Sequence, residues 1–343
     1  MNDTAPNEAW DIGEPHFSAA TPLDRQLRFA LRYAVLAPSN HNTQPWSFIV
    51  DGDTVEVCAD RTRALAVVDP FDRELLIGCG AALFNLRVAL RRFGLAYAIT
   101  LFPSELDPDI VALVQVSRDA NGDSQLQALF EALTTRVTTR APFVDEPVAA
   151  SLQRKLIDAC NAEGAIACCV ERKSGREALA QLVVDADHAQ FADPRFRREL
   201  ASWIHPLRHD DGMPAYGSGV GALLDFTVPL VTSVVRVFDA GAGVPATHRH
   251  LVEGSPLMMG IATMRDDREA WLATGQALER MLLVAASEGL TASYLNQPIE
   301  VEPLREQLRT LLHVDGVPQL LLRIGRGPGA SHTPRRPWSD VMS

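Results

Sequence analysis

Hydrophobic positions recur at helical spacing in the first patterned stretch of the chain and alternate with polar positions in the next. Residues 23–34 carry apolar side chains three or four positions apart, and the preceding Thr21-Pro22 pair is typical of a helix start. Residues 48–57 then alternate around an Asp-Gly turn. The pattern therefore predicts a helix followed by a β-hairpin.

The same unit occurs twice along the chain. Residues 80–95 and 275–290 align without a gap, and each copy has a Gly-Leu pair 14 residues after its first glycine and a short strand after that pair. A later strand follows in both copies, at 110–116 and 319–324. Ala/Leu-rich helices resemble one another, so a shared helix alone is weak evidence. The ordered series of helix, stop, strand, loop and strand favours an internal duplication.

The repeat divides the chain into two halves. We expect a flexible tail at 1–20, a first half at 21–120 and a second half at 121–343. Between about 205 and 253 the pattern dissolves into Gly, Pro and small residues, and a long insertion of this kind usually serves as a lid or arm. The other elements predicted for the second half are helices near 126–133, 151–162 and 179–186, and strands at 165–170 and 256–263, while an apolar run at 228–237 interrupts the insertion.

The loop between the first helix and the hairpin is dense in hydrogen-bonding side chains. It reads Ala37-Pro38-Ser39-Asn40-His41-Asn42-Thr43-Gln44-Pro45-Trp46. Its two prolines fix their own φ and bias the preceding residues toward extended forms, so the loop is expected to be stiff. Such a loop suits binding of a flat polar ligand, although an Asn/Ser turn between two core elements explains the same residues.

Two basic segments are candidates for anion binding. Arg136, Thr138 and Arg140 alternate along the chain, so in an extended segment their side chains share a face and can converge on one anion. A second segment, Thr333-Pro334-Arg335-Arg336-Pro337, follows the last predicted strand. A solvated basic turn and a basic tail are the alternative interpretations.

The Pro-Ser-x-x-Asn-x-Gln-Pro-Trp pattern at 38–46 resembles the signature loop of the FMN-dependent nitroreductase family. Together with Asp-Arg-Glu-Leu at 72–75 and the run at 80–86, it is most similar to the Acg-like subgroup, in which one chain carries two nitroreductase-like halves. The resemblance implies an α+β, nitroreductase-like fold: an internally duplicated pseudo-dimer with central, mainly antiparallel sheets flanked by helices, and one FMN between the halves.

The resemblance also assigns residues to the cofactor. Arg136 and Thr138 would hold the phosphate, and Arg140 would face flavin N1 and the C2 carbonyl. Asn296-Gln297 would place a backbone amide near N5, where the family often has Glu-Gly. The remaining candidates are loop residues over the ring and a C-terminal arginine on the phosphate, with Arg335 favoured: Pro38, Ser39, Asn40, Asn42, Gln44, Arg335 and Arg336.

Each half retains a different part of one such site, so we expect one flavin per chain and a monomeric pseudo-dimer, with further dimerisation open. The resemblance implies an NAD(P)H-dependent FMN oxidoreductase that passes hydride through flavin N5 to a nitroaromatic, a quinone or a similar acceptor, with ping-pong kinetics. The rival is an FMN-storage protein with little turnover, whose insertion at 205–253 covers the flavin. A flavin-free structural relic is the third possibility.

Charge and cysteine usage narrow the partners and the compartment. The net charge of −11 and the lack of a dense Lys/Arg cluster argue against nucleic acid and anionic membranes as partners. The five cysteines show no C-x-x-C spacing, which predicts a reducing compartment. The N-terminus lacks the pattern of a signal peptide, and the apolar runs are shorter than the ~20 residues of a membrane span. The expected location is cytoplasmic.

Four further sequence patterns are weaker indications of a metal, ligand or catalytic site. His205 and His209 are four apart, but Pro206 interrupts a helix across them, so a metal pair is not expected. His248-Arg249-His250 fits a surface turn better than a ligand set. The short Gly241-Ala242-Gly243 run lacks the strand-turn-helix context of a dinucleotide site, and no nucleophile elbow supports a Ser-His-Asp hydrolase.

Overall fold

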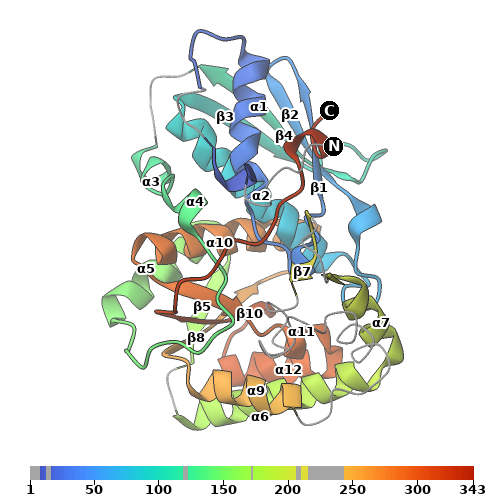
Figure 1. Ribbon diagram of the computed structural model, residues 1–343, viewed down its shortest axis with the longest axis vertical. Helices are drawn as coiled ribbons and strands as arrows, with labels where there is room; N and C mark the ends of the chain where they lie inside the picture. The colour runs from blue at the N-terminus through green and yellow to red at the C-terminus, as the bar shows by residue number, and fades with distance from the viewer. Residues whose placement is uncertain (1–7, 13–16, 119–122, 171–172, 206–209, 215–242) are drawn as a thin grey trace.

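The computed structural model describes residues 8–12, 17–118, 123–170, 173–205, 210–214 and 243–343. Two four-stranded sheets enclose a pair of long helices, α2 and α10, in the middle of the molecule (Figure 1). The strands of the first sheet, in the order β1-β2-β4-β3, are β1 (Trp46–Asp51), β2 (Thr54–Ala59), β4 (Ile110–Arg118) and β3 (Leu95–Leu101). Those of the second, in the order β5-β8-β10-β9, are β5 (Ile166–Cys169), β8 (Leu257–Thr263), β10 (Val317–Gly325) and β9 (Thr291–Tyr294).

Every neighbouring pair of strands in the two sheets is antiparallel. The main helices are α1 (Leu23–Ala34), α2 (Arg73–Arg92), α5 (Ala150–Asn161), α6 (Lys173–Ala192), α7 (Pro194–Ser202), α9 (Gly243–Glu253), α10 (Arg268–Ser287) and α12 (Glu302–Leu312). The short elements are α3 (Ser124–Gln127), α4 (Ala132–Thr135), α11 (Gln297–Glu300), β6 (Ile204–His205) and β7 (Met213–Pro214). The fold is therefore α+β with antiparallel sheets, as the sequence predicts.

The two halves repeat one order of elements. The series α1-β1-β2-α2-β3-β4 corresponds to α5-β5-β8-α10-β9-β10, and the two sheets have matching strand orders. Each long helix ends at a glycine with positive φ, Gly94 (72°) or Gly289 (70°), before its strand. The second half differs by insertions: α6, α7 and α9 lie between β5 and β8, where the first half has a tight hairpin. The predicted duplication is thus visible in the topology.

The long helices of the repeat cross at their matching glycines. A Cβ built on Gly80 would lie 2.1 Å from the carbonyl oxygen of Leu272, and one built on Gly275 would lie 2.0 Å from that of Ile77. Only glycine allows this approach. The repeated glycine read from the sequence therefore marks the contact between the halves, and both helices begin earlier than the repeat, at Arg73 and Arg268.

Four details differ from the sequence prediction. The helix expected near 126–133 is two short helices, α3 and α4. The N-terminal region is not entirely a free tail, because Trp10 is buried and its indole Nε1 donates to the carbonyl of Thr333 (3.0 Å). The insertion ends in a regular helix, α9, which packs on α6. His248-Arg249-His250 therefore lies on a helix and is not a turn.

Several predicted features cannot be compared. The expected boundary near residue 120, the residues following His205 up to His209, the apolar run at 228–237 and Gly241-Ala242 fall outside the described residues. All five cysteines are free thiols, with Cys79 and Cys160 buried. None of the helices within the described ranges has the length and apolar character needed to cross a lipid bilayer.

Candidate functional site

A cavity of about 260 Å³ lies where the two halves meet. Its walls come from the loop after α1, the start of α2, the segment after α4, the β9–α11 turn and the C-terminal segment. The structure brings most of the sequence candidates to this cavity: Pro38, Ser39, Asn40, Asn42, Arg136, Thr138, Arg140, Asn296, Gln297 and Arg335. The first and second halves both contribute, which is what complementary parts of one site require.

The loop after α1 is held in a tight left-handed turn. His41, Asn42 and Gln44 have φ values of 50°, 55° and 51°, a region that L-residues seldom adopt. The Ser39 hydroxyl accepts from the Gln44 amide N–H (2.8 Å), and the Asn42 side-chain Nδ2 donates to the carbonyls of Gly212 (3.1 Å) and Pro334 (3.0 Å). The loop is stiff, but hydrogen bonds and αL residues fix it as much as the prolines do.

Two predicted residues lie behind this loop and do not line the cavity. The Gln44 side chain is fully buried; its Nε2 donates to the Asp210 carbonyl (2.8 Å), and its Oε1 accepts from the Arg336 amide (2.8 Å). The Arg336 guanidinium donates to the Gln44 carbonyl (3.2 Å) and lies 3.5 Å from Asp60 Oδ2. Both side chains fasten the C-terminal segment to the loop after α1. We therefore do not expect Gln44 or Arg336 to contact a ligand in the cavity directly.

The three alternating residues after α4 do share one cavity. The segment runs beside β9, where the Thr139 amide donates to the Ala292 carbonyl (3.1 Å), and this contact keeps it extended. Arg136 is nevertheless engaged by the protein, because its Nη2 donates to the Leu36 carbonyl (2.8 Å) and its Nε lies 3.3 Å from Glu279 Oε1. Part of the role expected of Arg136 is therefore structural.

Arg335 crosses from the C-terminal segment to the first half. Its Nη2 donates to the carbonyls of Leu36 (3.0 Å) and Ala37 (3.1 Å), and its Nη1 donates to Asn42 Oδ1 (3.0 Å). The guanidinium carbon stacks over the Trp10 ring, 4.8 Å from its centroid. Arg335 rather than Arg336 is thus the C-terminal arginine of the cavity.

This end of the cavity carries uncompensated positive charge. Within the described residues, neither Arg140 nor Arg335 forms an ion pair with a carboxylate, and the contact found for the Arg140 guanidinium is Met213 Sδ at 3.8 Å. Burial and nearby Arg136 lower the pKa of Arg335 to about 9. Burial, with Arg140 adding to it, lowers the pKa of His41 to about 4.

A carboxyl pair lies at another part of the wall. Glu74 accepts from Asn40 Nδ2 (2.6 Å) and from Arg73 Nη2 (2.5 Å), while Glu300 accepts from Gln190 Nε2 (2.6 Å). Burial raises the pKa of both carboxyls. The charge of Glu74 raises the pKa of Glu300 further, whereas a hydrogen bond with Glu300 lowers the pKa of Glu74.

An Asp–His pair that the sequence did not predict also lines the cavity. His248 on α9 lines the cavity, and its Nδ1 lies 2.8 Å from Asp187 Oδ2 on α6. Gln297 Nε2, from the β9–α11 turn, lies 3.3 Å from Asp187 Oδ1. Val244, His248 and Val252 stand four apart, and this spacing was the available signal for a helix.

The rest of the wall near α9 is apolar. It comes from α6, α7, β6, β7 and α9, and its side chains are Phe191, Phe196, Leu200, Ile204, Met213 and Val244. Such a surface suits a planar apolar group. The cavity thus combines a cationic end, a hydrogen-bonding loop and an apolar wall.

Polar atoms without partners gather in the side chains that line the cavity. Within the described residues, the buried atoms that lack a hydrogen-bond partner include the Tyr294 hydroxyl, Gln297 Oε1, His332 Nδ1 and Arg335 Nε. Buried polar groups are normally satisfied, so such a group of atoms indicates a binding site. No group of three or more possible metal ligands occurs in the part of the chain that the structure describes.

Comparison with known proteins places the chain in a family. A model described as the nitroreductase family matches residues 246–326, from within α9 to the end of β10. Rv3131 of Mycobacterium tuberculosis, provisionally named an NAD(P)H nitroreductase, is 30% identical over 94% of this chain and 92% of its own. The chain therefore belongs to the nitroreductase family.

Other relatives and solved structures are more distant. The acg protein of Mycobacterium tuberculosis is 28% identical over 92% of this chain and 95% of its own, and PigM of a Serratia strain is 23% identical over 94% of each. The crystal structure of the FMN-dependent nitroreductase NfnB from Mycobacterium smegmatis covers 62% of this chain and 96% of its own, with 16% identity and a TM-score of 0.41. That structural likeness adds no weight to the assignment.

Proposed function

We propose that this protein is an NAD(P)H-dependent FMN oxidoreductase with one cofactor site per chain. The observation that carries the proposal is the excess of positive charge at one end of the cavity, where Arg140 and Arg335 line the wall beside Arg136. Arg335 is buried and has no carboxylate partner within the described residues, which is costly, and a phosphate would relieve that cost with charge-assisted hydrogen bonds. Several relatives are named NAD(P)H nitroreductases, which supports the same class of reaction.

The residues present fit FMN. Arg136, Thr138 and Arg335 would hold the phosphate, and the Pro38–Asn42 loop would lie against the flavin ring. Arg140 would stand near N1, where a fixed cation stabilises the reduced form. When bound, FMN supplies the hydride relay between a nicotinamide and an acceptor such as a nitroaromatic or a quinone. The protein supplies binding, orientation and electrostatics.

The test begins with the purified protein. We expect yellow absorbance, or its appearance when FMN is added to the colourless protein, at one FMN per chain. We also expect anaerobic bleaching by NADH or NADPH and recovery of the colour with a quinone. A protein that neither contains nor takes up FMN would contradict the proposal and would favour a flavin-free role.

Variants of Arg140 test its role at the ring. Arg140→Gln should lower the reduction potential of bound FMN by some tens of millivolts, since about 30 mV corresponds to 1.4 kcal/mol for a two-electron couple. Arg140→Lys keeps a positive charge and should recover much of the potential. Equal potentials for the wild type and Arg140→Gln would place Arg140 away from N1.

A second candidate, FMN storage, is favoured by one observation. Residues 210–214 of the insertion are fastened to the loop after α1: Gly212 and Asp210 supply carbonyls to Asn42 and Gln44, and Asp211 forms an ion pair with Arg63. Met213 of the same segment contacts Arg140. If this cover stays closed over bound FMN, the protein will be yellow, and neither NADH nor NADPH will bleach it.

A further inference from the structure

The pair formed by Asp187 and His248 has no role in holding FMN as proposed above, yet it lies in the wall of the same cavity. The Asp187 side chain is 1% exposed and that of His248 is 21% exposed, so the imidazole reaches the cavity and the carboxylate stands behind it. Their contact, Nδ1 to Oδ2, is 2.8 Å. A carboxylate that accepts only can bond this nitrogen when Nδ1 carries a proton.

This arrangement fixes which nitrogen faces the ligand. With Nδ1–H donated to Asp187, Nε2 is the nitrogen left for the cavity, and no hydrogen bond within the described ranges engages it. A carboxylate that orients an imidazole in this way sets its tautomer and direction. His248 thus presents Nε2 to a ligand bound beside it.

The position of His248 relative to the proposed flavin site gives its Nε2 a chemical role. Gln297 stands in the turn expected near flavin N5, and its Nε2 lies 3.2 Å from His248 Nδ1. Phe191, Phe196 and Val244, which form the apolar wall, line the same cavity as His248. A planar acceptor lying on this wall would share the cavity with His248 Nε2.

We infer that His248, oriented by Asp187, is the proton donor to a planar aromatic acceptor that is reduced on oxygen. This inference rests on the proposed function. A quinone needs one hydride and one proton to become a hydroquinone. The hydride comes from the reduced cofactor, and the proton comes from Nε2–H of the imidazolium: the new O–H bond forms as the N–H bond breaks, and the ring takes its proton back from water.

Charged groups surround the imidazole on several elements. Asp187 faces it from α6, and Glu300 lies one turn beyond Gln297 on α11. On α9 itself, Arg249 is engaged by Gln181 and Glu253. Asp187 is therefore the carboxylate that contacts the imidazole directly.

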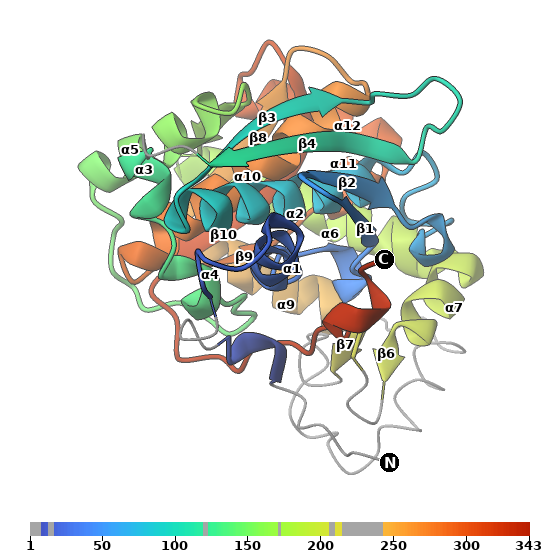
Figure 2. The same ribbon diagram turned by 90° about the horizontal axis from the view of Figure 1, so that it is seen from above.

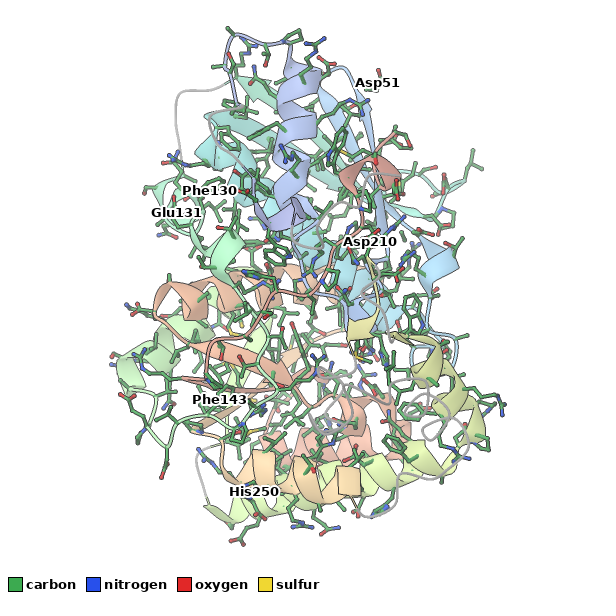
Figure 3. All side chains as sticks on the ribbon, viewed as in Figure 1. Asp51, Phe130, Glu131, Phe143, Asp210 and His250 are labelled. Atoms are coloured by element: carbon green, nitrogen blue, oxygen red, sulfur yellow. The ribbon has the colours of Figure 1, made fainter. Side chains whose placement is uncertain are left out.

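The test compares His248→Asn with His250→Asn. Asparagine retains a donor for Asp187 but lacks Nε2, and His250 is an exposed residue of the same helix (Figure 3). In stopped-flow reoxidation of the FMN-loaded, reduced protein by menadione, His248→Asn should be about 100-fold slower, within the usual range for a general acid. Ferricyanide takes electrons without a proton, so reoxidation by ferricyanide should be unchanged in both variants.

A binding measurement gives a readout independent of turnover. Without NAD(P)H, 4-nitrophenol should bind the oxidised protein with its oxygen on Nε2, and its phenolate absorbance should appear at lower pH than in water. His248→Asn should bind this probe at least tenfold more weakly, and His250→Asn should not differ from the wild type. Asp187→Asn, which keeps the imidazole but loses its carboxylate, should fall between them.

The outcomes separate the two proposals. If FMN does not bind, or if neither nicotinamide bleaches it, the proposed function fails. If bleaching is normal but His248→Asn reoxidises with menadione as fast as the wild type and binds 4-nitrophenol equally well, the function stands and the role of His248 is overturned. Equal slowing with menadione and ferricyanide would indicate a structural defect and would also overturn it.

Discussion

The two histidines beside the arginines of the cavity, His41 and His332, are held neutral by their surroundings. Burial lowers the pKa of His41 to about 4, with Arg140 adding to it. Burial likewise lowers the pKa of His332 to about 4, with Arg136 and Arg335 adding to it. In the unfolded chain, both histidines bind a proton near the ordinary histidine pKa of 6.5. In the folded protein, they bind it only at lower pH.

Stability should consequently fall as the solution becomes acidic. Each histidine binds its proton first in the unfolded state, so unfolding is favoured progressively as pH drops from 6.5 toward 4, and not above that range. For each histidine, the full pKa shift corresponds to about 3 kcal/mol of unfolding free energy, and partial exposure of the side chain reduces this contribution to about 1–2 kcal/mol. His41→Asn suits the left-handed φ and should flatten this loss in urea unfolding between pH 7 and 4. The exposed His250→Asn serves as control, and identical curves for His41→Asn and the wild type would contradict the assignment.

Arg136 and Glu279 form an almost fully buried pair, 4% and 0% exposed at their side chains. Arg136→Met should destabilise the cofactor-free protein by about 3 kcal/mol in urea unfolding, because it leaves a buried carboxylate without its cation. Adding Glu279→Gln should restore part of that loss. The exposed pair Arg326–Glu146 is the control, and Arg326→Met should cost less than about 1 kcal/mol. A single variant as stable as the wild type would show that the buried pair does not stabilise the fold.

The sequence indicates which residue types line the cavity, but it does not indicate which hydrogen bonds and ion pairs each of them forms. The alternation of Arg136, Thr138 and Arg140 predicts a shared face, and all three residues line one cavity. The alternation could not show that Arg136 forms an ion pair with Glu279. It also could not show that Gln44 and Arg336 are hydrogen-bonded to each other behind the loop after α1. Those contacts join segments far apart in the chain, and no local pattern encodes them.

At the scale of elements, the contact between the halves depends on two glycines. Gly80→Ala should destabilise the protein by at least 3 kcal/mol in urea unfolding, because its Cβ would lie 2.1 Å from a backbone oxygen that cannot move without separating α2 from α10. Gly78→Ala, on the same helix, is the matched control: its nearest neighbour would be Pro45 Cγ at 3.4 Å, an ordinary contact. A tolerated Gly80→Ala would mean that the helices are free to move apart.

Elements with strong periodicity were predictable, and those in the insertion were not. The hairpin, the two long helices and the paired strands follow from local alternation and from the repeat. α9 was missed because its apolar residues are few and its neighbours are glycine-rich, so its place depends on packing against α6. For the same reason, His248 was assigned to a surface turn in the sequence analysis.

At the scale of the whole molecule, the C-terminal segment ties the second half to the first (Figure 2). After Arg335, the chain runs along the outer edge of β1, which is an edge strand of its sheet. There the Phe48 amide donates to the Val341 carbonyl (2.7 Å), and the Ser343 amide donates to the Phe48 carbonyl (2.9 Å). The segment thus has two separable roles: Arg335 completes the cavity, and the last residues cover a sheet edge.

Two truncations should separate these roles. Removal of residues 338–343 exposes the β1 edge but keeps Arg335, so the protein should still bind one FMN per chain while associating more strongly in size-exclusion chromatography, since unpaired edges recruit other chains. Removal of residues 332–343 also deletes Arg335 and the acceptor for Trp10, and it should abolish stable FMN binding in an absorbance titration. If the longer truncation binds FMN as tightly as the full chain, the two halves form the phosphate site without their C-terminal link.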